Sequence, residues 1–375
     1  MACFLGIANE PGIVEAQAKI ERRARNLLKG LLDSCAEVAC RALRVTGALD
    51  AIVGNTDVMR DVRKTCWAAA FGERLDTVSS MSRLFQTTPV LIEGATGTGK
   101  ELVARALCLS MRGRWKRGHG WTAAPTESVH LASLPAALVE SAIFGHERGA
   151  YSGAHKERPG VLERCHGGVV FLDEVAELPM STQVSLLRTL QEGKTRRLGA
   201  DADRDAAPRI VSATHKDLEE LVAENRFRLD LLYRLSSVSI AVPPLVERLA
   251  DIPLLVEKES ELAEPAARPA LRDKFDRFMK LHPNYSWPGN VRELHAVVRT
   301  LALGLQPRLK QIASRPEQRL TVPSGLADTA WTLREAQRWY CGRALEKAGT
   351  QERAAKLLDI NRGTLRNHLE QDRDD

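Results

Sequence analysis

The sequence predicts an α/β fold in which helices cover both faces of a parallel sheet, followed by smaller helical units. Between Asp50 and about Leu305, apolar strand-like runs alternate with amphipathic stretches. This alternation is typical of parallel sheets, because each crossover between parallel strands needs its own connecting element. The runs are TPVLIEG, SVHLASL, GGVVFLDEV, PRIVSATH and SSVSIAVPP. A chain of 375 residues suffices for two or three domains, at roughly 100–200 residues each.

The composition excludes several protein classes. A hydrophobic content of 44% with 27% charged residues is ordinary for a globular protein, and no apolar run approaches the roughly 18 residues of a membrane helix. The first residues lack a basic segment followed by a long apolar one, so we expect a cytoplasmic protein without membrane contact. Seven cysteines without a CxxC pair argue against a disulfide framework and a zinc site. The net charge of +6 fits a polyanionic partner.

Helical patterns flank this alternating region. Ile13 to Val45 is one amphipathic pattern, and it leaves two interpretations open: a helix that packs on the neighbouring domain, or a helix that dimerises. Residues 306–330 are polar, basic and rich in proline without periodicity, which indicates a linker. From Trp331 to Glu370 the pattern predicts helix throughout.

The string LIEGATGTGKE predicts a phosphate-binding loop. An apolar strand leads into the loop, and the amphipathic ELVARAL follows as a helix. Backbone N–H groups of such a loop surround phosphate oxygens, the helix N-terminus adds its dipole, and the lysine adds positive charge. Glu101 stands where a serine or threonine would bind Mg²⁺, so the metal must be held from elsewhere. The loop consists of Gly94, Ala95, Thr96, Gly97, Thr98, Gly99 and Lys100.

The run GGVVFLDEV supplies the missing carboxylates. Asp173 and Glu174 follow four apolar residues, at the carboxyl end of a strand, where open α/β sheets bind ligands. Asp173 can orient Mg²⁺ through water, and Glu174 can accept a proton from the water that attacks a γ-phosphate. An Asp-Glu pair alone is usually a solvated strand end, but the phosphate-binding loop favours a catalytic role.

The segment HERGAYSGAH interrupts a helical pattern. Gly149 and Gly153 each weaken a helix by roughly 1 kcal/mol relative to alanine, so the chain is expected to break there. The break presents an aromatic and a hydroxyl side chain, Tyr151 and Ser152.

Together these motifs resemble the AAA+ ATPases that activate bacterial transcription by the sigma-54 form of RNA polymerase. The resemblance runs from about Ala51 to the C-terminus. In that family the loop reads GAFTGA after FGHE, and here FGHERGAYSGA has the same frame. The resemblance implies ATP and Mg²⁺ as cofactors, sigma-54 RNA polymerase and DNA as partners, and a homo-oligomer from dimer to hexamer. It implies a sigma-factor contact by Gly149, Ala150, Tyr151, Ser152, Gly153 and Ala154.

Further residues take roles from the same resemblance. RFRLDLLYRL resembles the segment that sends arginines into the neighbouring subunit's nucleotide site, which implies Arg228 and Arg234. YSWPGNVREL resembles the second sensor, which implies that Arg292 contacts the nucleotide. AIVGN implies an adenine contact by Ile52, Val53 and Gly54, and Thr214 belongs to the first sensor. The implied domains are a helical segment (1–49), an α/β nucleotide-binding subdomain (50–243), a helical lid (244–305), the linker and a C-terminal reader (331–375).

Two departures from the family pattern concern this site. The family places an amide, usually asparagine, on the strand before the loop, where it switches the catalytic glutamate; here His130 stands there. His215 stands where the first sensor usually has asparagine. Imidazole donates a hydrogen bond as an amide does, but it titrates near pH 6.5, so turnover is expected to be slow or pH-sensitive. Extra residues relative to the family spacing lie around Gly72 to Thr88 and Gly113 to Thr126.

The C-terminal string TQERAAKLLDINRGTLRNHLEQ predicts a helix-turn-helix. Small apolar residues, Ala354 and Ala355 with Leu358, let two helices cross closely, and Asp359 to Asn361 form the turn and the cap. The string resembles the Fis-type DNA-binding domain of these activators. Nine Lys/Arg against eight Asp/Glu after Trp331 give no large basic field, so avidity from oligomers is expected. The implied DNA contacts are Arg362, Thr364, Arg366, Asn367 and His368.

The leading hypothesis is therefore a DNA-bound hexameric ATPase that remodels the closed sigma-54 polymerase complex into an open one. A DNA-binding regulator with weak or no ATPase activity, suggested by His130 and His215, is the second hypothesis. An AAA+ remodeller of another protein substrate is the third.

Overall fold

The computed structural model describes residues 31–72, 82–111, 113–116, 120–309, 333–358, 361 and 363–366. The chain forms two compact units, of which the first ends at Arg308. In the described residues, no helix combines the length and the apolar character that crossing a membrane requires.

A five-stranded sheet forms the centre of the first unit, with every neighbouring pair of strands parallel. All six residues of β10 are buried, as are the first four of β7, because helices cover both faces of a central parallel strand. Each apolar run expected from the sequence overlaps one strand, so the α/β prediction is confirmed. In spatial order the strands are β11 (Val238–Ala241), β1 (Val90–Glu93), β10 (Arg209–Thr214), β7 (Val169–Asp173) and β4 (Thr126–His130).

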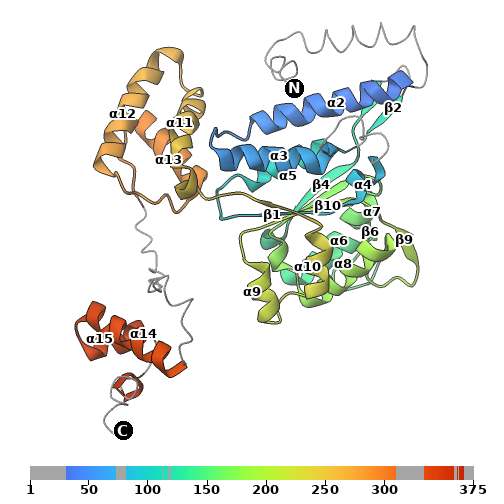
Figure 1. Ribbon diagram of the computed structural model, residues 1–375. Helices are drawn as coiled ribbons and strands as arrows, with labels where there is room; N and C mark the ends of the chain where they lie inside the picture. The colour runs from blue at the N-terminus through green and yellow to red at the C-terminus, as the bar shows by residue number, and fades with distance from the viewer. Residues whose placement is uncertain are drawn as a thin grey trace. The chain divides into compact units, whose positions relative to one another are not determined.

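Three helices cover one face of the sheet: α2 (Leu31–Asp50), α3 (Asp57–Phe71) and α5 (Lys100–Leu109) (Figure 1). Helix α2 lies along α5 and buries Val45, Ala48 and Leu49 in the shared core. The described part of the N-terminal helix therefore packs on the neighbouring domain, one of the two interpretations left open by the sequence; residues 13–30 of that pattern lie outside the described ranges.

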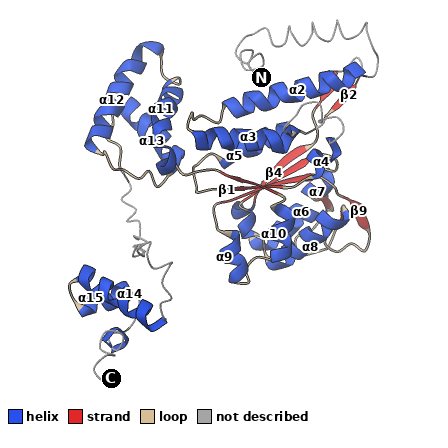
Figure 2. Cartoon of the chain, in the orientation of Figure 1, coloured by secondary structure: helices blue, strands red, loops and turns tan. Residues whose placement is uncertain are grey.

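Further helices cover the other face, so the strands lie between two helical layers (Figure 2). These helices are α6 (Ala136–Phe144), α7 (Val161–Arg164), α8 (Met180–Glu192), α9 (Leu218–Ala223) and α10 (Leu229–Leu235), with short 3-10 turns at η2 (Leu131–Ser133) and η3 (Val175–Glu177).

The residues that the sequence indicated as extra form small additional elements. Helix α4 (Ser82–Thr87) and the hairpin of β2 (Arg114–Lys116) and β3 (Gly120–Thr122) fall within them; residues 73–81 and 117–119 lie outside the described chain. Two further antiparallel pairs join β5 (Gly145–His146) to β6 (Arg158–Pro159) and β8 (Lys194–Arg196) to β9 (Asp203–Asp205).

A helical lid follows the sheet. Its core is aromatic: Trp287 is 1% exposed and stacks on Phe275 with ring centroids 6.4 Å apart. The lid comprises η4 (Leu245–Asp251), α11 (Ile252–Ser260), η5 (Pro265–Ala267), α12 (Arg268–Leu281) and α13 (Asn290–Ala302).

The second unit contains α14 (Leu333–Ala348), α15 (Gln351–Leu357) and a helical turn at residues 363–366. Its core joins Ala344 of α14 to Ala354 and Ala355 of α15 and to Leu365. The sequence predicted helix throughout Trp331 to Glu370, and this was wrong at Gly349, whose φ of 70° ends α14 in a conformation that glycine adopts without strain. Asn361 Oδ1 accepts a hydrogen bond from Thr364 N at 2.7 Å, which confirms its role as a helix cap.

Candidate functional site

The phosphate-binding loop connects β1 to α5, as the sequence predicted. Lys100, the first residue of α5, is 8% exposed, and its Nζ donates hydrogen bonds to Gly94 O at 2.7 Å and Ala95 O at 3.3 Å. Burial lowers the pKa of Lys100, and the charges of Glu174 and Asp173 partly oppose that shift. The ammonium group therefore lies within the loop, beside both carboxylates predicted to be catalytic.

The two carboxylates lie at the end of the central strand β7. Asp173 ends β7 between β4 and β10, and Glu174 follows with a φ of 58°, a conformation rare outside glycine that is often found at functional sites. His130 Nδ1 lies 2.8 Å from Asp173 Oδ2, and His215 Nδ1 lies 2.7 Å from Glu174 Oε2. His130, expected from the resemblance to act on Glu174, thus contacts Asp173 instead, and the imidazole on Glu174 is His215.

The residues present fit a magnesium ion that arrives with a nucleotide. Asp173 Oδ2 faces His130 and Oδ1 accepts the Glu174 N–H at 3.1 Å, which leaves lone pairs for a metal-bound water. Among the described residues, no group of three or more His, Cys, Asp or Glu could hold a metal by itself. Mg²⁺ needs no such cage, because one or two carboxylates, water and substrate phosphates complete its oxygen shell. Glu101 is exposed in the first turn of α5.

The lid lies directly against the loop. Asn290 Nδ2 donates to Thr96 O at 3.0 Å, while Asn290 Oδ1 accepts from Leu245 N at 2.7 Å. Arg292 N donates to Gly97 O at 3.3 Å, so the predicted second-sensor residue lies beside the loop. Gly97 has a φ of 81°, and a Cβ there would be 2.4 Å from Gly289 O, so only glycine permits this approach.

Sequence reasoning missed a second connection between lid and loop. Arg248 is 2% exposed and donates from Nη2 to Thr98 O at 2.8 Å, while Nη1 reaches Met59 Sδ at the same distance. Asp251, 1% exposed, accepts from the backbone N–H of Asn55 and Thr56 at 2.7 and 3.0 Å. An Arg and an Asp three residues apart carry no distinctive sequence signal; Asn290, in contrast, lies within the distinctive WPGNVREL string.

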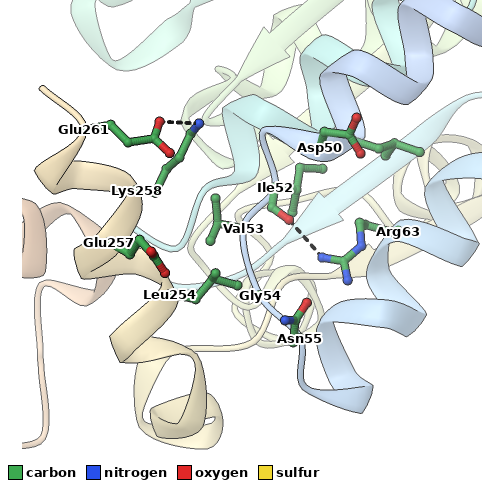
Figure 3. Close-up of a pocket in the computed structure, with 11 residues that line it drawn as sticks. Asp50, Ile52, Val53, Gly54, Asn55, Arg63, Leu254, Glu257, Lys258 and Glu261 are labelled. Atoms are coloured by element: carbon green, nitrogen blue, oxygen red, sulfur yellow. Dashed lines mark hydrogen bonds and ion pairs between the residues drawn. The ribbon is translucent and has the colours of Figure 1, made fainter. Parts of the chain in front are cut away.

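A cavity of about 370 Å³ adjoins the segment expected to contact adenine. Figure 3 shows Ile52, Val53 and Gly54 along one side and Leu254 with Glu257 of α11 on the other. Arg63 Nη1 donates to the Ile52 carbonyl at 2.9 Å and fixes this wall. Gly54 is also needed for packing, because a Cβ there would lie 2.7 Å from Asp251 Oδ2.

Thr214, which the resemblance assigns to the first sensor, ends β10 in register with Glu93 at the end of β1. Thr214 is fully buried, and its carbonyl accepts the N–H of Gly94 at 3.3 Å, at the start of the phosphate-binding loop. The Thr214 hydroxyl accepts the Lys216 N–H at 3.0 Å. Thr214 therefore ties β10 to the loop through its backbone.

The loop Gly149–Ala154 is a closed turn after α6. Gly149 N donates to Ala154 O at 2.8 Å, and a Cβ added to Gly149 or Gly153, at φ 84° and 111°, would meet no atom within 4 Å. Tyr151 is 38% exposed and lies edge-on to the buried His146 at 5.1 Å between ring centroids. Ser152 is exposed at the tip, whereas Ala150 is half-buried and Ala154 buried.

An ionic cluster supports the base of this loop. Arg197, with its side chain 6% exposed, donates to both oxygens of Glu163 at 2.8 and 2.9 Å and to Glu147 at 3.3 Å. Arg204 also reaches Glu147 at 3.2 Å. Glu147 lies two residues before the loop, so these contacts join the β8–β9 hairpin to the base of the loop.

The two predicted arginine fingers lie near the start and the end of α10. Arg228 pairs with Asp230 at 2.7 Å, and Arg234 donates to Leu190 O at 2.8 Å. Among the described residues, neither side chain hydrogen-bonds to the phosphate-binding loop or its carboxylates. Two exposed apolar side chains lie beside Arg228: Leu229 is 49% and Tyr233 71% exposed.

Of the predicted DNA contacts, two lie in the described chain. Arg366 is exposed and Thr364 half-buried beside the core residue Leu365. Arg362, Asn367 and His368 lie outside the described residues.

Comparison with known proteins gives two matching domain families. Residues 69–241 match the Sigma-54 interaction domain, and residues 246–314 match the AAA+ ATPase lid domain. The chain is 37% identical to the DNA-binding transcriptional regulator NtrC of Azospirillum brasilense, over 77% of this chain and 66% of that protein. It is 39% identical to the transcriptional regulatory protein ZraR of Escherichia coli, over 74% of this chain and 62% of that protein. The chain thus spans slightly less than two thirds of the length of these relatives.

Solved structures share the fold of this chain. NtrX from Brucella abortus aligns with a TM-score of 0.51 and 28% identity, covering 96% of this chain and 80% of that one. NtrX in complex with ADP aligns with a TM-score of 0.51 and 29% identity, covering 90% and 75%. The phosphate-binding loop, the loop Gly149–Ala154 and the lid follow one another along the chain as the resemblance implies, and residues 69–241 belong to the Sigma-54 interaction domain family, followed by an AAA+ ATPase lid domain.

Proposed function

We propose that this chain hydrolyses ATP as a homo-oligomeric ring, of up to six subunits, bound to DNA upstream of promoters, and that it remodels the closed sigma-54 polymerase complex into an open one. The observation that carries the proposal is the convergence of Lys100, Asp173 and Glu174 beneath a lid, on the same subdomain that exposes Tyr151. We place the protein in the cytoplasm, because DNA and RNA polymerase are there.

The catalytic step follows from the positions of the side chains. The N–H groups from Gly94 to Gly99 and the ammonium of Lys100 bind the β- and γ-phosphates. Bound Mg²⁺, oriented by Asp173, supplies neutralising charge. Glu174 accepts the proton of a water as the water oxygen bonds to the γ-phosphorus and the bond to the leaving ADP oxygen breaks.

A neighbouring subunit completes the site in this proposal. Arg228 and Arg234 are already surface groups of α10, next to the exposed apolar side chains Leu229 and Tyr233. An arginine that reaches a γ-phosphate stabilises the charge of the transition state and raises the rate by about 10³–10⁵. Hydrolysis therefore requires assembly.

In this proposal, the loop Gly149–Ala154 contacts the sigma factor. Exposed Tyr151 and Ser152 offer an aromatic face and a hydroxyl to the sigma factor, as phenylalanine and threonine do in GAFTGA. The loop is built on α6, which follows β4 and the carboxylate-bound His130. A change at the nucleotide therefore has a short path to the tip.

The second unit anchors the ring on DNA. The helical turn at residues 363–366 is capped by Asn361 and places Arg366 on the surface, where a DNA-contacting side chain must lie. Thr364 and Arg366 would contact a phosphate or a base edge, and linked copies would supply affinity through avidity.

The proposal is tested by promoter opening. Purified protein, sigma-54 holoenzyme and a supercoiled sigma-54 promoter are mixed with ATP or ADP, and single-stranded thymines are detected with permanganate. Promoter melting in the presence of ATP but not of ADP supports the proposal. Phosphate release without melting would indicate a remodeller of another substrate, and DNA binding without phosphate release at any protein concentration would indicate a regulator without ATPase activity.

A further inference from the structure

The two histidines of the site contact different carboxylates, and the strand register explains why. His130, the last residue of β4, pairs in register with Asp173 of β7. In-register residues of parallel strands project to the same side of the sheet, so the imidazole meets the aspartate directly. On the other side of β7, Ala213 of β10 pairs with Asp173, which places His215 two residues beyond.

Glu174 follows a different course because the chain turns there. With a φ of 58°, Glu174 leaves the strand direction of β7, and its carboxylate reaches the residue after β10. His215 contacts the same oxygen twice: Nδ1 lies 2.7 Å and the backbone nitrogen 3.3 Å from Glu174 Oε2. No hydrogen bond engages Oε1 in the described part of the chain.

The chemistry of these contacts shows which imidazole nitrogen donates the hydrogen bond. An ionised carboxylate only accepts hydrogen bonds, so Nδ1 of each imidazole carries the proton. Glu174 is therefore held through one oxygen and keeps the other for a water proton. Its side chain is 14% exposed, and that of His215 is 39% exposed, so the pair is partly shielded from solvent but accessible to a nucleotide.

We propose that the two histidines divide the positioning of the site: His215 orients the base Glu174, and His130 orients the magnesium carboxylate Asp173. The inference rests on the proposed ATPase function. It moves the restraint on the glutamate from β4, where the resemblance places it, to the residue after β10. Removal of each imidazole is then expected to impair a different measurable step.

The test compares His215→Ala, His215→Asn, His130→Ala and His130→Asn in the full-length chain. One readout is kcat and KM for ATP at saturating Mg²⁺. The other, independent of hydrolysis, is the Mg²⁺ concentration at half-maximal binding of a fluorescent, non-hydrolysable ATP analogue. Asparagine keeps an N–H donor at each position and serves as the conservative variant.

For His215→Ala we expect kcat to fall by about tenfold or more with KM and the Mg²⁺ midpoint unchanged, and His215→Asn to recover most of the loss. For His130→Ala we expect the Mg²⁺ midpoint to rise by about tenfold, in line with the loss of a hydrogen-bond partner of a metal-binding carboxylate, with kcat at saturating Mg²⁺ preserved.

Two outcomes overturn the inference. In one, His130→Ala lowers kcat at saturating Mg²⁺ and His215→Ala does not, which would mean that His130 of β4, and not His215, orients Glu174. In the other, both variants change kcat and the Mg²⁺ midpoint equally, which would mean that the two histidines do not have separate positioning roles. Absence of phosphate release by the wild-type protein would instead refute the proposed ATPase, and with it the role of Glu174 as a base.

Discussion

Replacement of Gly97 by alanine tests the contact between lid and phosphate-binding loop. Two costs are expected from the structure. A φ of 81° costs a non-glycine residue about 1 kcal/mol. The new Cβ would also lie 2.4 Å from Gly289 O, so the lid must retreat and weaken two hydrogen bonds, Asn290 to Thr96 O and Arg292 N to Gly97 O, at about 1 kcal/mol each. The total is about 3 kcal/mol.

Gly167 provides the matched control. It has a φ of 70° but no atom within 4 Å of the added Cβ, so Gly167→Ala should incur the backbone cost alone. The difference of about 2 kcal/mol should weaken ADP binding by roughly 30-fold in Gly97→Ala relative to Gly167→Ala. Fluorescent ADP titration of both folded variants measures this. Equal affinities would refute the inference that lid contact with this loop contributes to nucleotide binding.

Three further predictions concern output, stability and pH. Tyr151→Ala should abolish promoter melting but leave phosphate release near the wild-type rate, because the ring is 38% exposed on the loop and lies edge-on to His146 rather than beside the phosphate-binding loop; a parallel loss of phosphate release would contradict this. Arg209→Ala should lower the free energy of unfolding in urea by about 3 kcal/mol, because Arg209 is 1% exposed and donates to Thr88 O, Ser110 Oγ and Ala69 O; the exposed Arg188→Ala should change it little. Burial raises the pKa of the Cys66 thiol to about 12, so its contribution to stability is complete below the unfolded-state pKa near 9 and is lost as the pH rises toward 12. Cys66→Ala should reduce this alkaline loss by up to about 1.4 kcal/mol per pH unit, measured by urea unfolding from pH 8 to 10.5, and an unchanged slope would contradict it.

The sheet and the phosphate site could be predicted because their signals are local. A buried parallel strand must be an apolar run, and a loop that binds phosphate must combine glycines with a lysine at a helix start. Asp173 and Glu174 follow from the same rule, since ligands gather at the carboxyl ends of parallel strands. The role of each of these residues can therefore be predicted from the short stretch of sequence around it.

The contacts that join distant segments could not be predicted. Arg248 meets Thr98 across 150 positions, and Asp251 meets Asn55 across 196. Neither residue belongs to a periodic pattern or a glycine-rich string. The contact of His130 with Asp173, and of His215 with Glu174, depends on strand register and on the turn at Glu174, and a motif resemblance that fixes positions along the chain does not specify either.

The central claim is that hydrolysis occurs between subunits, and a mixing experiment tests it most directly. Glu174→Gln and Arg228→Ala proteins are each expected to be inactive in phosphate release. Mixed in equal amounts and allowed to exchange subunits, they should recover about a quarter of the wild-type rate, because about one interface in four joins an intact Glu174 to an intact Arg228 of its neighbour. Mixed assemblies that form but release no phosphate would contradict the account.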